Sequence, residues 1–100
     1  MASFKKLTAT GSVFSGRCRF HGFVLGTDST NDPTITIEDR AGAGGQNAGE
    51  IIPTCTYDAT ALGLNGATGL PPEGVLCDNG IYVTISVAGG GAVEVTVFYS

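Results

Sequence analysis

Hydrophobic and polar residues alternate with a period of two along much of the chain, which is the pattern of half-buried β-strands. The alternation is clearest in two segments near the C-terminus, Gly80–Ala88 and Ala92–Tyr99. Gly89–Gly91 separate them, and glycine permits the positive φ angles of a tight turn. We therefore predict a C-terminal hairpin in which Val87 pairs with Val93 and both apolar stripes fall on one face.

A second hairpin is predicted from Arg17–Leu25 and Pro33–Asp39, because the GTDSTND segment between them is rich in turn-forming residues. In one register of this hairpin His21 lies opposite Glu38, and a shift of two residues places Arg19 there instead. The residues that the alternation directs to the core are Cys18, Phe20, Val24, Ile35 and Ile37.

Shorter strands are predicted at Phe4–Thr10, Glu50–Tyr57 and Gly74–Cys77. Two segments are too rich in glycine to form regular structure: Ala41–Gly49, and Asp58–Pro72 apart from one helical turn within Ala59–Leu64. These elements add up to seven or eight short antiparallel strands in one domain that spans residues 1–100. The predicted fold is all-β, a single small β-sandwich of jelly-roll or immunoglobulin-like type.

Composition supports a folded β domain and narrows the range of partners. Hydrophobic residues make up 42% of the chain and charged residues only 14%, which argues against a disordered chain and against a helical bundle. No apolar run approaches the length of a membrane helix. Nine carboxylates outnumber five cations, giving a net charge of −4, so we expect neither nucleic acid nor an anionic membrane as a partner.

The chain contains three cysteines, Cys18, Cys55 and Cys77, with no CxxC spacing. An odd number favours reduced, mostly buried thiols in a protein that folds in a reducing cytosol. One disulfide with one free thiol is the alternative. Lys5 and Lys6 precede no apolar segment, so we expect no secretory signal.

Candidate chemistry is sparse. His21 is the only histidine and no serine lies in a nucleophile motif, so we predict that the protein is not an enzyme. Cys18 and His21 are three residues apart on a predicted strand and point to opposite faces, so we expect no metal and no cofactor. Asp28 and Asp32 resemble part of a calcium loop without its central glycine and distal glutamate. We favour an Asx turn there, with weak calcium binding as the alternative.

Tyr82 and Phe98 are the most informative side chains of the predicted C-terminal hairpin, because they stand opposite each other on its outward face. An aromatic pair on a solvent face needs a cover. Either a loop within Leu62–Leu70 folds over it, or the pair lies in a subunit interface.

The chain contains three segments in the order SGRCRFHGFVLGT, PTITIED and GIYVTISVAGGGAVEVTVFYS. In the order of these segments it resembles small β-sandwich virion proteins of tailed bacteriophages, of the capsid decoration (cement) or head-fibre type. The resemblance implies a non-enzymatic, often trimeric protein that adheres to a capsid. The matched positions are core and turn positions, so no functional residue is carried over from the family.

We therefore expect a capsid decoration protein, made in the host cytoplasm and located in the virion, which binds the major capsid protein as a homotrimer. The alternative is a ligand- or carbohydrate-binding module of a phage fibre, and a small hydrolase ranks third. Residues 1–6 are expected to form a mobile basic arm. The predicted contact residues are Phe4, Lys5, Lys6, Tyr82 and Phe98.

Overall fold

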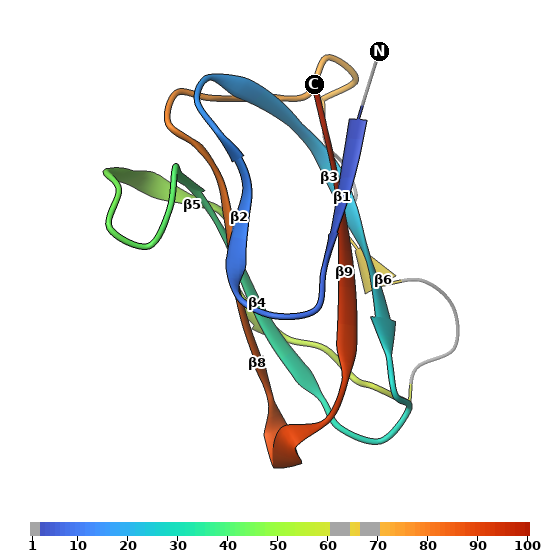
Figure 1. Ribbon diagram of the computed structural model, residues 1–100. Coiled ribbons are helices and arrows are strands. Elements are labelled where there is room, and N and C mark those ends of the chain that lie inside the picture. Colours follow the sequence, from blue (N-terminus) through green and yellow to red (C-terminus); the bar gives the residue numbers. More distant parts are fainter. Residues whose placement is uncertain (1–2, 61–64, 67–70) are drawn as a thin grey trace.

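Two antiparallel sheets stacked face to face form the protein (Figure 1), in a computed structural model that describes residues 3–60, 65–66 and 71–100. The first sheet has the strand order β1 (Ser3–Leu7), β9 (Val93–Tyr99), β3 (Cys18–Thr27), and β3 also pairs with β6 (Asn65–Gly66) and β7 (Val75–Cys77). The second sheet has the order β2 (Gly11–Ser15), β8 (Gly80–Val87), β4 (Pro33–Arg40), β5 (Asn47–Thr56). The predicted all-β sandwich is confirmed, with nine strands among the described residues.

The core lies between the sheets and consists of the inward side chains of the alternating strands. Its fully buried members are Phe20, Pro33, Ile35, Ile37, Cys77, Ile81, Val83, Val95 and Val97. Burial of these apolar side chains is the main favourable contribution to folding. A single 3₁₀ turn (Ala88–Gly90) is the only helical element in the part of the chain that is described. No helix there is long and apolar enough to cross a membrane.

The predicted C-terminal hairpin is wrong, because β8 and β9 belong to different sheets. β8 pairs with β2 and β4, while β9 pairs with β1 and β3. The two valine-rich stripes meet across the core instead of side by side. The glycines serve the crossing loop: Gly89 and Gly90 have φ angles of 68° and 70°, and a Cβ on Gly89 would lie 2.8 Å from Asn31 Oδ1.

The second predicted hairpin is also wrong, since β3 and β4 lie in opposite sheets. The hairpin partner of β4 is β5. His21 and Arg19 therefore do not face Glu38, which lies opposite Tyr82 and Glu50. Both errors have one cause: alternation identifies the buried face of a strand but does not say whether two buried faces share a sheet.

A β-bulge shifts the alternation of β3 by one residue between Phe20 and Gly22. Gly22 has a φ angle of 123°, a value that glycine adopts without strain. Cys18 and Phe20 point inward as predicted. Beyond the bulge Phe23 and Leu25 are buried, each 3% exposed, and not Val24.

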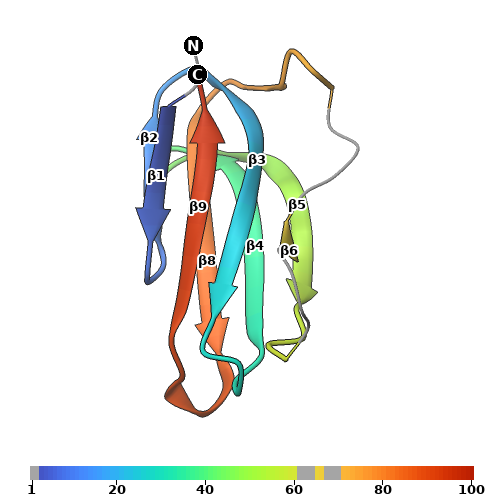
Figure 2. The same cartoon turned by 90° about the vertical axis from the view of Figure 1, so that its right-hand side faces the viewer.

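The three shorter predicted strands correspond to β1, β5 and β7, whereas β2 was not predicted. Turns and bends occupy 41–45 of the glycine-rich segment, and β5 begins at Asn47. Ser3–Leu7 do not form a free arm, because they pair with β9 along their length. In Figure 2, β1 and β2 lie together at one edge of the sandwich. The predicted helical turn falls mainly on 61–64, outside the described residues.

Candidate interaction surfaces

Strand pairing divides the five predicted contact residues between the two sheets. Phe4, Lys5 and Lys6 lie on β1, and Phe98 lies on the neighbouring strand β9. Tyr82 lies on β8, in the other sheet. The expected pairing of Tyr82 with Phe98 is therefore wrong, and the two rings belong to opposite outer faces. Most of the Leu62–Leu70 loop proposed as their cover lies outside the described residues.

Large apolar side chains gather on the outer face of the first sheet. Phe4 is 68% exposed and stands directly across from Phe98. Leu76, on β7, is 42% exposed and also points outward, because its neighbours Val75 and Cys77 face the core. Gly22, which lies across from Phe98 on β3, adds no side chain to this face. Leu76 lies opposite Arg19, which points to the same face, so we call only Phe4 and Phe98 the outer apolar patch.

The two lysines of β1 already have contacts within the protein. Lys5 Nζ donates a hydrogen bond of 3.0 Å to the carbonyl oxygen of Ser12 on β2, which ties the edges of the two sheets together. Lys6 Nζ lies 3.4 Å from Glu94 Oε1 in a pair whose side chains are about half exposed. Such an exposed pair contributes little to stability.

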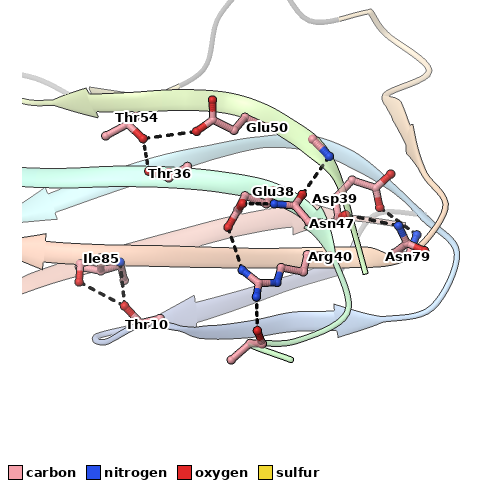
Figure 3. Close-up of polar contacts among 12 residues, drawn as sticks. Thr10, Thr36, Glu38, Asp39, Arg40, Asn47, Glu50, Thr54, Asn79 and Ile85 are labelled. Atoms are coloured by element: carbon pink, nitrogen blue, oxygen red, sulfur yellow. Dashed lines mark hydrogen bonds and ion pairs between the residues drawn. The ribbon is translucent and has the colours of Figure 1, made fainter. Parts of the chain in front are cut away.

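A regular array of hydroxyl groups covers part of the outer face of the second sheet. Two rows cross β5, β4 and β8. The rows consist of Thr56, Thr34 and Ser86, and of Thr54, Thr36 and Thr84. Within them the Oγ1 atoms of Thr34 and Thr56 lie 2.8 Å apart. Those of Thr36 and Thr54 lie 2.7 Å apart (Figure 3). We call these six residues the hydroxyl array.

A charged cluster continues the same face beyond the hydroxyl array. Arg40 Nη1 lies 3.6 Å from Glu38 Oε1, and the guanidinium stands 5.3 Å from the centre of the Tyr82 ring. Arg40 also donates to the carbonyl of Ala43, and Asn47 donates to Glu38 (Figure 3). Only 14% of the Glu38 side chain and 26% of the Arg40 side chain are exposed. Tyr82 is thus covered in part by Arg40.

His21 has structural contacts. Its Nε2 atom lies 2.8 Å from Ser100 Oγ, and its ring packs so closely on Gly74 that a Cβ there would lie 2.9 Å from Cε1. Cys18, three residues before His21, is buried in the core. Among residues 3–60, 65–66 and 71–100, no group of three or more His, Cys, Asp or Glu side chains is arranged to hold a metal ion.

Asp28 closes an Asx turn, as predicted. Its carboxylate accepts hydrogen bonds from the backbone of Thr30 and Asn31, from the Asn31 side chain and from the backbone of Ala92. These bonds, those from Asn31 first, hold the pKa of Asp28 well below its usual range. Asp32 accepts a bond from the Ala59 amide, so the two carboxylates cap different segments.

The cysteines fall into two environments. Cys18 and Cys77 are buried free thiols in the first sheet, at 5% and 0% exposure. Cys55 is a free thiol on β5 and is exposed. The predicted burial of the thiols holds for two of the three. Cys55 lies opposite the buried Ile35 and is exposed because β5 is the edge strand of its sheet.

Comparison with protein-family models, with curated proteins and with solved structures finds no match to this chain.

Proposed function

We propose that this protein is a non-enzymatic structural protein of a bacteriophage virion, a capsid decoration (cement) protein that binds and stabilises the head surface. The observation that carries the proposal is the outer apolar patch, above all Phe4, whose ring is 68% exposed although it belongs to an ordered strand. Aromatic rings that the fold does not use are typical of the buried centre of a protein interface.

The exposed edge of β1 favours binding to a different protein over pairing with a second copy of this chain. β1 has β9 as its neighbour on one side and ends the sheet on the other, so its second edge is available for an added strand. Two copies of β1 paired in antiparallel fashion would bring Lys5 and Lys6 against the same lysines of the partner, which is unfavourable. An extended acidic or neutral segment of a major capsid protein would meet no such repulsion.

The proposed homotrimer would then assemble through surfaces other than β1. Association adds buried area that a domain of 100 residues lacks, and it leaves the outer apolar patch free for the capsid. In this proposal the protein is made in the host cytoplasm and carried in the virion.

Co-sedimentation with phage heads that lack the protein tests the proposal. Phe4→Ser should weaken attachment at least tenfold, because it removes the exposed ring and leaves strand pairing intact. Thr84→Ser, on the hydroxyl array of the opposite face, is the matched control and should bind like the parent chain. Equal binding by both variants would overturn the role of the patch. No binding by the parent chain would overturn the function. Deleting 1–6 is a poorer test than the point change, because it also removes most of β1.

The hydroxyl array supports a second candidate, the carbohydrate-binding module of a phage fibre. Four of its members, Thr54, Thr56, Thr84 and Ser86, are exposed, and Tyr82 and Glu50 flank it. Hydroxyl and carboxylate groups beside an aromatic ring suit the polar hydroxyls and apolar faces of sugars. Titration with neutral oligosaccharides followed by NMR should shift the amides of β4, β5 and β8 if this candidate is correct. Shifts that are absent at millimolar sugar, or equal in a Thr84→Val variant, would exclude it.

A further inference from the structure

Cys18 and Cys77 occupy directly opposite positions in the antiparallel pairing of β3 with β7. The pairs that follow along the ladder are Arg19 with Leu76 and Phe20 with Val75. Both cysteines face the core, where the Cys77 thiol donates a hydrogen bond of 3.5 Å to the carbonyl oxygen of Val75. Cys55 belongs to the other sheet. The odd cysteine count therefore resolves into one opposed pair and one separate surface thiol.

Strand geometry makes this pair suited to a covalent link. Directly opposite residues of an antiparallel pair have Cα atoms about 4.5–5.5 Å apart, and disulfides join residues whose Cα atoms are about 4.4–6.8 Å apart. We propose that Cys18 and Cys77 form a disulfide site, oxidised by a low-molecular-weight disulfide such as oxidised glutathione, which locks β7 to β3. The proposal does not depend on the function proposed above.

The reaction takes place in two exchange steps. The Cys18 thiolate attacks one sulfur of oxidised glutathione, forming a mixed disulfide and releasing one glutathione thiolate. The Cys77 thiolate then attacks Cys18 Sγ, forming the Cys18–Cys77 bond and releasing the second glutathione thiolate. The protein thiols give up two protons to the two glutathione thiolates. In total, two protein thiols are oxidised and one disulfide is reduced to two thiols.

Burial makes the oxidation slow while β7 stays in place. Burial, then the nearby Cys18 and Asp39, raises the pKa of Cys77 to about 12. Burial, then Asp39, also raises the pKa of Cys18. Thiolate, the reacting form, is therefore scarce in the folded protein. β7 has only three residues and pairs with β3. We expect the link to form during folding, or when β7 separates briefly from β3.

The disulfide would close a loop of about 60 residues, which restricts the unfolded chain and so stabilises the folded protein.

The exposed Cys55 would complicate the measurement by intermolecular oxidation, so the test uses the full chain carrying Cys55→Ser. This protein is unfolded and refolded with or without oxidised glutathione. Mass spectrometry should show the loss of two hydrogen atoms and a peptide linking the two cysteines. The melting temperature should rise on the order of 10 °C and return to its initial value on reduction.

The matched control is the same chain with Cys18→Ala added, which retains one core thiol. It should show no linked peptide and no rise in melting temperature. If it fails to fold, Cys77→Ala takes its place. Two results would overturn the proposal: both thiols remaining reactive after oxidative refolding of a protein that regains its native circular dichroism, or a linked protein that melts at or below the temperature of the reduced form.

Discussion

On the outer face of the second sheet, polar side chains contact one another across strands, whereas the outer face of the first sheet exposes large apolar side chains. Thr36, on the second face, is only 9% exposed and bonds to Thr54. Glu38 and Arg40 on that face are mostly covered. Phe4 and Leu76, on the first face, are 68% and 42% exposed.

The two faces differ in what they leave for a partner. The polar groups of the second face largely satisfy one another, so covering that face requires new hydrogen bonds for those that are displaced. The apolar patch of the first face has no hydrogen bonds to lose, and covering it gains hydrophobic free energy. This difference favours the first face as the attachment surface of the proposed function.

Both outer faces depend on the core that the two sheets share. A charge placed at the centre of this core should cause the largest loss of stability. Val95 on β9 is fully buried. Val95→Asp would bury an unpaired carboxylate and cost about 4 kcal/mol or more, against a total stability of about 5–15 kcal/mol for a small domain. Circular dichroism should show an unfolded or barely folded chain.

Thr96→Asp is the control for this variant, because Thr96 is the next residue of β9 and points to the outer face beside Lys6. We expect a loss of stability below about 1 kcal/mol. A cooperatively melting Val95→Asp variant, or equal effects of both changes, would show that the inward face of β9 is assigned incorrectly.

The ion pairs of the two faces should differ in strength. Arg40→Met removes the partner of the mostly covered Glu38 and the contact with the Tyr82 ring, and we expect a loss of about 1–3 kcal/mol. Lys6→Met breaks the exposed pair with Glu94 and should cost less than about 0.5 kcal/mol. Urea unfolding measures both, and equal losses would contradict the contrast between the faces.

The sequence predicts which residues are inside this fold better than it predicts which strands are neighbours. Alternation correctly places Ile81, Val83, Val95 and Val97 in the core. It fails on strand pairing, because a hairpin and an inter-sheet crossing bury the same stripes. Gly89 packs on Asn31 in the loop between β3 and β4, and this contact indicates that the chain crosses between the sheets after β8. The contact is evident only from the folded structure and not from the sequence.

The candidate surface was predicted in part. Phe98 is predicted as an outward aromatic and Phe4 as a contact residue of a mobile arm, whereas the structure pairs the two directly through β1 and β9. The hydroxyl array was missed, although T-x-T at Thr34–Thr36 and Thr54–Thr56 is visible in the sequence. Strand order is what aligns these motifs, and local patterns do not encode it.

Acid should weaken the end of the sandwich at which Asp28 links two inter-sheet loops. An aspartate of the unfolded chain titrates near pH 4, and hydrogen bonds lower the pKa of Asp28 in the folded protein. The folded state therefore binds fewer protons, so its stability is full above about pH 5 and falls as the pH decreases toward 2. Asp58, whose pKa is lowered by the Thr60 side chain and then its backbone, acts in the same direction.

Asp28→Asn should reduce the change in melting temperature between pH 5 and 2, because asparagine does not titrate and its oxygen still accepts the bonds from Thr30 and Asn31. Thermal melts at several pH values measure the slope. The Asp58→Asn variant, measured in parallel, shows how much of the acid sensitivity comes from the Asp58 carboxylate. An unchanged slope in the Asp28 variant would show that this carboxylate does not couple folding to protons.

The smallest effect on stability is expected at Phe4, although it is the most exposed side chain of the outer apolar patch. Phe4→Ala removes a ring that is 68% exposed and should change the free energy of unfolding by less than about 0.5 kcal/mol. Phe98→Ala removes a half-buried ring beside Gly22 and should cost more, about 1–2 kcal/mol. Urea unfolding of both variants compares two phenylalanines that face each other in the same sheet. If Phe4→Ala destabilises the fold as much as Phe98→Ala, the ring belongs to the protein's own packing, and the argument for a surface kept free for a capsid partner fails.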